Sequence, residues 1–511
     1  MANLINALKN ETNYKLTENM AVAHRSTTSA LYDMFAFGGA YRNRSDADVI
    51  LLFKNAFEEN PTYALKCLFY LRDVRGGGQG ERRFFRLCIK WLAQNHPEEM
   101  RRNLAYIPEF GRWDDLYEFV GTPLEKSAFR VIKEQLILDI QSKTPSLLAK
   151  WLKSENTSSP KSRLLGNLTR NYMNMDHAQY RKVLSKLRKR INVLERLMSA
   201  GEWDKIEFDK IPSKAGFIYR NAFARHDVER MQEGAKRSYE DFAKDTETKV
   251  NAKTLYPYEV VAMAHKFDST TMSWYGWEHK TPTQADLNNT DRLIVNKYWE
   301  NLEDVFNGYS LNALPVIDTS GSMTWTGNSS VKPIDVAISL GMYCAERANG
   351  PFKNHYISFA SRPQLISVEG VDFVDKVNRI YRANLCDNTN LEAAFDLVLN
   401  TALKNNIKQE DMPSSIVVVS DMEIDRARTT KCEVGTLMEN IRRKWERSGY
   451  KMPALVYWNV DARNNTILDN GPNVSYVSGF STSTFEQIMT GKTGYTLCLE
   501  KLNSERYACI Q

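Results

Sequence analysis

Hydrophobic residues in the N-terminal part of the chain recur at helical spacing. From about residue 17 to residue 265, apolar positions lie three and four residues apart, and polar or glycine-containing turns separate the runs. The clearest helical stretches are residues 47–57, 63–72, 82–95, 127–142 and 179–200. Roughly ten to fourteen such helices predict a stacked, HEAT-like helical-repeat array or solenoid. An irregular helical domain is the alternative, because no strict sequence period is present.

The pattern changes after residue 313. Strands and helices alternate over residues 313–318, 334–347, 355–360, 365–368, 391–403, 415–421, 434–448, 454–460, 474–478 and 484–490. Such alternation predicts a mostly parallel, doubly wound sheet covered by helices on both faces. In sheets of this kind, ligands bind beyond the carboxyl ends of the strands.

These patterns divide the chain into three regions. A chain of 511 residues is too long for one ordinary core, so two or three domains are expected. We predict a helical domain over residues 1–265, a connecting segment over 266–312 and an α/β domain over 313–511. The fold class is therefore α-helical followed by α/β.

Oxygen-bearing side chains follow the first predicted strand of the α/β domain. The segment Asp318-Thr319-Ser320-Gly321-Ser322 places a carboxylate and hydroxyls on the loop that leaves an apolar run. Oxygen ligands with few negative charges suit Mg²⁺ or another divalent cation, which keeps some of its waters and leaves a coordination position open. The alternative is a turn followed by a helix cap, because Asp and Ser also hydrogen-bond to nearby backbone.

Two later segments have the chemistry to complete such a site. Thr389 lies where a helical pattern begins, and a second apolar strand ends in Asp421. Together the three segments resemble the metal-ion-dependent adhesion site (MIDAS) of von Willebrand factor A domains. That family often has Gly-Gly before the Thr, where this chain has Asp387-Asn388. The resemblance implies that the direct or water-mediated ligands are Asp318, Ser320, Ser322, Thr389 and Asp421.

Positive charge is concentrated in the predicted helical region. Residues 1–300 hold 47 Lys and Arg against 38 Asp and Glu, whereas residues 301–511 hold 21 against 24. Residues 151–200 alone hold 11 basic and 3 acidic side chains. A polyanionic partner for the helical region is therefore expected.

The basic residues gather in three places. In the predicted helix 179–200, an apolar stripe leaves seven cations on the other faces, among them Lys182 and Arg188. These cations repel one another unless a polyanion binds, although a solvated helix face is the alternative. The glycine-rich turn 76–80 is flanked by further arginines and offers backbone N–H groups to a phosphate, or else it is a flexible turn. A third segment pairs Arg112 with Trp113, which is expected to pack more than to stack on a base. The candidate RNA contacts are Arg75, Arg82, Arg83, Arg112, Lys182 and Arg188.

The whole layout resembles a known group of proteins. A helical half with an R-D-x-R-G-G-G-x-G turn at residues 72–80 and a G-R-W-D-D-L segment at 111–116, followed by D-x-S-G-S, is similar to the TROVE-module proteins typified by the Ro autoantigen. Residues 180–182 to 221–227 resemble more closely a branch of that group found in phages, bacteria, fungi and plants. The resemblance implies a ring of helical repeats held shut by the A domain, with single-stranded ends of structured RNA in a positive hole and small noncoding RNA outside.

Other classes of protein are disfavoured. The start of the chain shows no signal peptide and no run of about 18 apolar residues spans a membrane, so a cytoplasmic protein is expected. The seven cysteines are scattered without C-x-x-C spacing, as expected of a reduced protein without structural zinc. Neither H-E-x-x-H nor G-x-S-x-G is present, and Glu486 replaces the first glycine of a phosphate-binding loop ending at Thr493. No enzymatic activity is expected.

Two functions remain from different classes. The first is a noncatalytic RNA-binding protein of the Ro type. The second is a protein-interaction module that uses the metal site to capture a partner carboxylate, with the helices as scaffold. A structural component of a larger particle has no positive signature in the sequence.

Overall fold

The computed structural model describes residues 13–267, 271–273, 276–278, 281–308, 311–327, 329–383, 388–425 and 436–511. They form two compact units that do not follow the linear order of the chain. The first, here the sheet unit, comprises the described residues up to Cys67 with Gly77–Gln79 and Leu255–Ser504. The second, here the helical unit, comprises Leu68–Gly76, Gly80–Thr254 and Glu505–Gln511. The two units are defined by contacts and each combines separate segments of the chain. The domain boundaries expected after residues 265 and 312 therefore stay a prediction.

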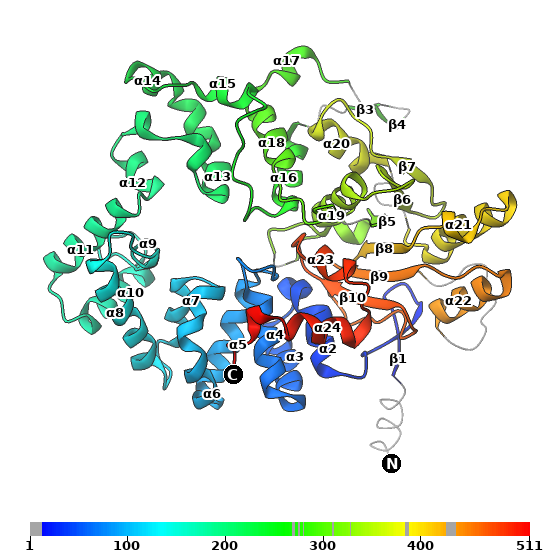
Figure 1. Ribbon diagram of the computed structural model, residues 1–511, viewed down its shortest axis with the longest axis horizontal. Helices are drawn as coiled ribbons and strands as arrows, with labels where there is room; N and C mark the ends of the chain where they lie inside the picture. Colours follow the sequence, from blue (N-terminus) through cyan, green and yellow to red (C-terminus); the bar gives the residue numbers. More distant parts are fainter. Residues whose placement is uncertain are drawn as a thin grey trace. The chain divides into compact units, whose positions relative to one another are not determined.

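The sheet unit is built on a six-stranded mixed sheet in the order β10-β9-β8-β5-β6-β7 (Figure 1). Five strands run parallel, and β7 pairs antiparallel with β6 at one edge. Because the chain enters at β5 and builds outwards to both sides, the strand order reverses between β5 and β8. The predicted mostly parallel sheet is confirmed. Its strands are β5 (Ala313–Asp318), β6 (His355–Phe359), β7 (Leu365–Ser367), β8 (Ser415–Ser420), β9 (Ala454–Asn459) and β10 (Val474–Ser478).

The two central strands are buried along their whole length. All six residues of β5 and of β8 are buried, as continuous apolar runs in parallel sheets predict. Helix α19 (Pro333–Arg347) packs against β5, β6 and β8. Gly341 lets this helix approach closely, since a Cβ atom there would overlap the Ile317 side chain. The core therefore holds the C-terminal end of β5 in a fixed place.

Other elements of the sheet unit surround this core. The helices with a predicted counterpart are α3 (Asp46–Glu59), α21 (Leu391–Asn405), α22 (Leu437–Ser448) and α23 (Thr484–Met489). The predicted helix α4 (Pro61–Arg72) begins in this unit, and its residues from Leu68 onwards belong to the helical unit. Helix α18 (Thr290–Glu300) lies within the segment predicted as a connection and packs on α16 (Pro257–Ala264) and α20 (Phe373–Ala383). Helices α2 (Ala30–Phe37) and α24 (Gly494–Leu502) pack against β10.

The sheet unit also contains an N-terminal hairpin that helical periodicity did not predict. Strands β1 (Tyr14–Leu16) and β2 (Val22–His24) pair antiparallel. The turn between them forms a β-bridge from Met20 to Asp425, and His24 bridges to Ile467. Periodicity does not show this hairpin, because three-residue strands are too short to display an alternating pattern.

The helical unit contains amphipathic helices. Helix α5 (Arg82–Asn95) buries residues 84, 85, 88, 89, 92 and 93 on one side, the spacing expected of a half-buried helix. Helix α8 (Glu125–Gln141) confirms the helix predicted over residues 127–142. Others are α6 (Pro97–Asn103), α7 (Ile107–Phe110), α9 (Leu148–Trp151), α10 (Pro160–Tyr172), α13 (Ser213–Arg225), α14 (Asp227–Gln232) and α15 (Tyr239–Lys244). HEAT-like repetition and ring closure stay predictions.

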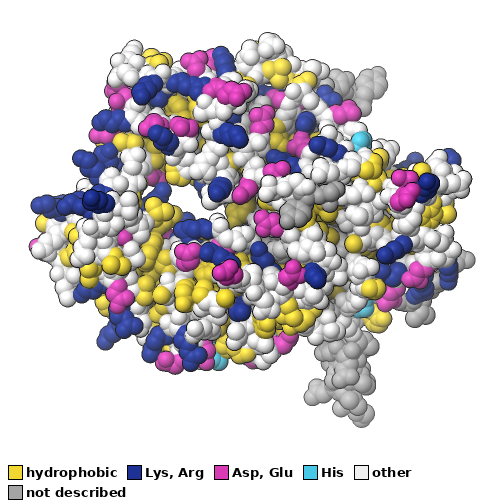
Figure 2. Space-filling model, viewed as in Figure 1, with side chains coloured by type: hydrophobic (Ala, Val, Ile, Leu, Met, Phe, Trp, Pro, Cys, Tyr) yellow, Lys and Arg dark blue, Asp and Glu magenta, His cyan; other side chains and the backbone are white. Residues whose placement is uncertain are grey.

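One predicted helix of this unit is broken. Residues 179–200 form α11 (His177–Arg190) and α12 (Leu194–Ser199) instead of one helix. Asn192 between them has a φ of 47°, in the left-handed region that Asn tolerates better than most residues. Lys and Arg side chains gather at the edge of the unit where α11 lies (Figure 2).

Two further expectations concern membranes and cysteines. Across the described ranges, no helix is both long and apolar enough to cross a membrane. Cys67, Cys88, Cys344 and Cys498 are buried free thiols and Cys509 is a half-buried one, whereas Cys386 and Cys432 lie outside the described residues.

Candidate functional site

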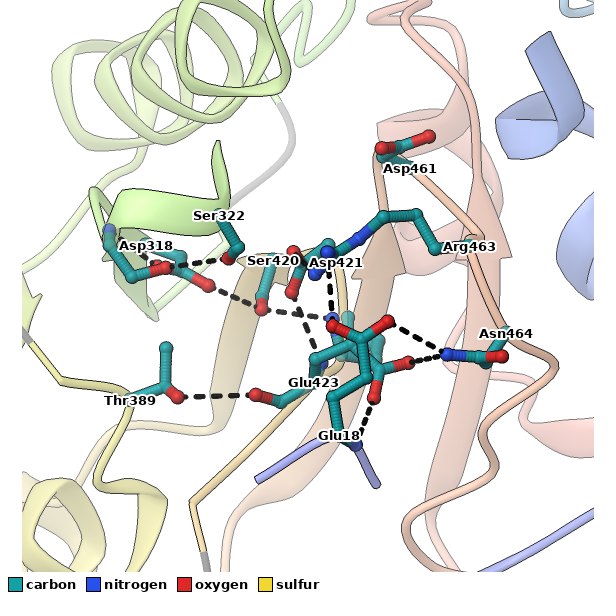
Figure 3. Close-up of polar contacts among 12 residues, drawn as sticks. Glu18, Asp318, Ser322, Thr389, Ser420, Asp421, Glu423, Asp461, Arg463 and Asn464 are labelled. Atoms are coloured by element: carbon teal, nitrogen blue, oxygen red, sulfur yellow. Dashed lines mark hydrogen bonds and ion pairs between the residues drawn. The ribbon is translucent and has the colours of Figure 1, made fainter. Parts of the chain in front are cut away.

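The candidate metal centre lies at the carboxyl edge of the sheet, where the strand order reverses. Asp318 ends β5, and Asp421 follows the last residue of β8. Because β5 and β8 are parallel neighbours, their C-terminal ends meet at one edge. Ser420 Oγ donates a hydrogen bond of 2.6 Å to Asp318 Oδ2 across the two strands (Figure 3). The structure thus brings the first and last predicted ligands together.

Asp318 is completely buried. Its Oδ1 accepts from the Ser320 backbone N–H at 2.9 Å, and the Ser320 and Ser322 hydroxyls lie 3.1 Å apart. Burial, and secondarily the neighbouring Asp421 carboxylate, raise the pKa of Asp318 well above its ordinary value. A buried carboxylate without a full counter-charge is costly. A divalent cation beside these oxygens would remove that cost, so the donor set fits a hard cation.

Asp421 is also buried, but a positive side chain already contacts it. Arg463 Nη2 lies 2.6 Å from Asp421 Oδ2, and Arg463 Nη1 lies 3.0 Å from Glu18 Oε2. Asp421 Oδ1 accepts from the Glu423 backbone N–H. Arg463 therefore links a predicted metal ligand to the turn of the N-terminal hairpin (Figure 3). A cation that binds Asp421 must share or displace this guanidinium.

Thr389 is placed differently from the other predicted ligands. Its hydroxyl lies 3.2 Å from the Glu423 carbonyl and 3.2 Å from Asp425 Oδ1. The Asn19 side chain donates to the same hydroxyl at 3.4 Å. Thr389 is buried beside the site, yet its hydroxyl contacts the segment after β8 and the turn of the N-terminal hairpin. Asp387, which precedes it by two positions, lies outside the described residues.

Sequence reasoning missed several residues of this edge. Glu423 accepts from the Glu18 backbone N–H at 2.7 Å and from Asn464 at 3.2 Å. Asp461 and Arg463 come just after β9, so the strand-end rule that identified Asp318 and Asp421 would have found them. Nothing local marks Glu18, because it reaches the site through the tertiary fold. Among the described residues, no group of three or more His, Cys, Asp or Glu is suited to a metal, so hydroxyls are needed to complete this site.

The glycine-rich turn engages its own polar groups. The N–H groups of Arg75 and Gly76 both donate to Asp73 Oδ1 at 2.9 Å. Arg75 Nη1 donates to the carbonyls of Pro108, Glu109 and Gly111. Arg75 therefore satisfies the end of α7, although its side chain is partly exposed. Arg83, also a predicted contact, is half-buried on α5.

Arg82 and Arg112 meet at one carboxylate. Arg82 Nη2 lies 2.9 Å from Asp114 Oδ2, and Arg112 makes two hydrogen bonds to the same side chain. The Arg112 guanidinium also stacks over the Trp151 ring at 4.0 Å. Trp113, predicted to pack, begins a 3-10 turn, Trp113–Phe119. The structure thus joins two segments that lie about thirty residues apart in sequence.

The two predicted contacts on α11 differ. The Lys182 side chain is exposed, with no hydrogen bond or ion pair to any described residue. Arg188 instead donates to the carbonyls of Ala149 and Leu152 and to Ser154 Oγ. Burial lowers the pKa of Arg188. Arg188 thus holds the turn after α9, whereas Lys182 faces solvent.

Comparisons with known proteins cover most of the chain. A family model described as Domain of unknown function (DUF2828) matches residues 17–163 and 145–307, and one described as Domain of unknown function (DUF7788) matches residues 312–503. A protein of Acanthamoeba polyphaga mimivirus, described as Uncharacterized protein L728, is 28% identical over 522 residues, which cover 94% of this chain and 85% of that protein. The crystal structure of the Deinococcus radiodurans RO (RSR) protein aligns with a TM-score of 0.48 and 14% identity, over 93% of this chain and 100% of that one.

Proposed function

The chain belongs to the family described as Domain of unknown function (DUF2828), and we propose that it is a noncatalytic, cytoplasmic RNA-binding protein of the Ro type. The observation that carries this proposal is the exposed basic face of α11. Arg181, Lys182, Lys186 and Lys189 are exposed, and none has an ion pair with another described residue.

The spacing of these four residues places them together. Positions 181, 182, 186 and 189 fall within less than half of the helix circumference at about 100° per residue. The buried residues Tyr180, Leu184 and Leu187 occupy the opposite side and fix the helix against the rest of the unit. Four unpaired cations on one rigid face repel one another. Release of counterions from a polyanion makes binding there favourable.

RNA is the polyanion that the sequence resemblance favours. We infer that structured or misfolded RNA with a single-stranded end, or a small noncoding RNA, binds the helical unit. Recognition through exposed Lys and Arg depends on backbone charge and shape more than on base identity. Closure of the helical repeats into a ring, with the α/β domain holding it shut, belongs to this proposal.

The test is gel retardation of a structured RNA with a single-stranded tail. Replacement of Lys182, Lys186 and Lys189 by Gln is expected to weaken binding by at least about tenfold at moderate salt. A matched control replaces Lys205, Lys210 and Lys244 by Gln, because these lysines of the same unit pair with Glu202, Glu207 and Glu240. The control changes net charge equally and should bind nearly as wild type. Equal weakening by both triple variants would mean that only total charge matters.

A second candidate function rests on the metal centre. A divalent cation held by Asp318, Ser320, Ser322 and Asp421 would offer an open coordination position to the carboxylate of a protein partner. Asp318 favours this function because its carboxylate is buried beside a second carboxylate, Asp421, where a cation would stabilise the ionised form. Thr389 would be a further ligand through water. Under it, the helices are a scaffold.

Magnesium binding tests the second candidate. We expect Mg²⁺ to raise the melting temperature of the wild-type protein and to leave that of Asp318→Asn unchanged, because the variant keeps the shape but loses the charge. RNA retardation should be the same for both proteins. If Mg²⁺ shifts neither protein, or shifts both equally, the metal centre is not at Asp318.

A further inference from the structure

A dense cluster of cations surrounds two adjacent aspartates in the helical unit. Asp114 and Asp115 are 4% and 0% exposed. Arg72 and Arg86 contact Asp115 at 2.8 and 2.6 Å, and Arg86 also contacts Asp114 and Glu118. The remaining members are Arg82, Arg112 and Lys153, all of which face Asp114. The cluster is defined here as these five cations and three carboxylates.

The charges of this cluster are layered. The two aspartates lie at its base, with Arg72 at 2% exposure beside them. The outer cations are more accessible, at 46% for Arg82, 30% for Lys153 and 25% for Arg112. Five positive charges meet three negative ones, so two remain in surplus. The surface presented to solvent is therefore positive, although the contacts beneath it are ion pairs.

Lys153 is the least satisfied member of the cluster. Its ammonium lies 4.0 Å from Asp114 Oδ2 and makes no hydrogen bond to any residue that the structure describes. Burial lowers the pKa of Lys153, and the neighbouring Arg86, Arg82 and Arg112 lower it further. Arg82 uses one nitrogen for Asp114, and its other N–H groups have no acceptor in the described chain. The N–H donors of Lys153 and Arg82 thus outnumber the protein acceptors that face them.

The backbone holds Lys153 in this position. Its N–H donates to the buried Tyr117 hydroxyl at 3.2 Å, and its carbonyl accepts from the Tyr180 hydroxyl at 2.9 Å. Arg188 ties the preceding turn through its bonds to Ala149 and Leu152. Trp151, beneath the Arg112 guanidinium, fixes the plane of that side chain. Lys153, Arg82 and Arg112 all lie around the same oxygen, Asp114 Oδ2.

We propose that Lys153, Arg82 and Arg112 form a binding site for a phosphate monoester, the dianionic end group of a phosphorylated nucleotide or RNA chain. A monoester carries close to two negative charges at neutral pH and three strong acceptor oxygens. It therefore matches the charge surplus and the free donors, whereas an internal diester carries one charge. The phosphate site stands without the RNA proposal, but its assignment to the phosphorylated end of an RNA rests on that proposed function.

The experiment compares two short single-stranded RNAs that differ only in a 5′-phosphate or a 5′-hydroxyl, with inorganic phosphate as a third ligand. Fluorescence anisotropy measures RNA binding to the full chain, and calorimetry measures phosphate binding. The wild-type protein should prefer the phosphorylated RNA by roughly tenfold, as charge-assisted bonds to one dianion predict. Lys153→Gln and Arg82→Gln should each reduce this preference towards equality and weaken inorganic phosphate binding.

Lys150→Gln is the matched control. Lys150 lies on α9, three residues before Lys153, and its Nζ is 3.8 Å from Glu195 Oε1 instead of facing Asp114. This variant should keep the preference for phosphate. The site is overturned if the wild-type protein binds inorganic phosphate no better than Lys153→Gln and does not distinguish the two RNAs. Phosphate binding that depends on Lys153 without discrimination of RNA ends would overturn the RNA source and support a small phosphorylated ligand. Phosphate binding with no affinity for either RNA would overturn the proposed function alone.

Discussion

At the scale of single residues, three carboxylates share one edge of the sheet with the Arg463 guanidinium. Asp318 ends β5, whereas Asp421 and Asp461 follow β8 and β9. Asp461 is 3% exposed, and one of its oxygens accepts from Asn43 at 3.1 Å. Burial raises the pKa of Asp461 to about 6, and the charge of Asp421 adds to this effect. Asp461 therefore resists ionisation in the folded protein.

This shift predicts how stability depends on pH. Because the folded pKa exceeds the ordinary value of 3.8, the contribution of Asp461 is complete below about pH 4 and is lost as pH rises through about 6. Asp461→Asn removes that loss while keeping an acceptor for Asn43. The variant should match the wild-type protein near pH 4 and exceed its free energy of unfolding at pH 8 by up to about 3 kcal/mol. Urea denaturation at both pH values measures the difference, and a constant difference would contradict the assigned pKa.

Residue chemistry at strand ends was predictable, but the partners of each charge were not. Asp318 and Asp421 were identified because a carboxylate after a buried strand faces the edge where ligands bind. Arg463 contacts Asp421 because β8 and β9 are neighbouring strands, and it contacts Glu18 because the N-terminal hairpin packs at this edge. Neither contact is visible in the sequence. The sequence suggested that the Arg75 and Arg188 side chains could contact RNA. In the structure, their guanidinium N–H groups donate to backbone carbonyls that only the folded chain brings near.

At the scale of elements, close packing of α19 on β5 positions the first strand of the site. Gly341→Ala would place a methyl group against Ile317 Cγ1 and Cδ1 in a buried layer. We expect this substitution to lower the free energy of unfolding by roughly 1–3 kcal/mol, as overpacked cores do. Gly321→Ala is the control, because nothing lies within 4 Å of its added Cβ. Thermal unfolding of the two variants measures the contrast, and equal stability would argue against the close approach.

Long elements followed from periodicity, whereas short elements and breaks did not. The strands β5 and β10 and the helix α5 have the predicted bounds, because continuous apolar or amphipathic runs define them. The interruption at Asn192 leaves the apolar stripe intact on both sides, so the pattern extends through a break that one left-handed residue produces. Helices α20 and α24 were missed, although the buried residues Phe373, Val374, Val377 and Ile380 of α20 recur at helical spacing.

At the scale of the whole molecule, chain order and spatial grouping differ. The described residues up to Cys67 belong to the same compact unit as the sheet, and Glu505–Gln511 belongs with the helices. Asp73 of the helical unit illustrates this, since it pairs with Arg506 at 2.9 Å. A sequence pattern reveals many of the long elements but carries no information on contacts between residues that lie hundreds of positions apart.

The most direct test of the RNA-binding proposal is the salt dependence of affinity. Each phosphate contact on single-stranded RNA contributes about 0.7 to the slope of log K against log salt. Relative to the wild-type protein, replacement of Lys182, Lys186 and Lys189 by Gln should lower the magnitude of this slope by up to about 2, while the Lys205, Lys210 and Lys244 control keeps the wild-type slope. If the α11 variant has the same slope and the same affinity as the wild-type protein, the claim that this basic face binds RNA is contradicted.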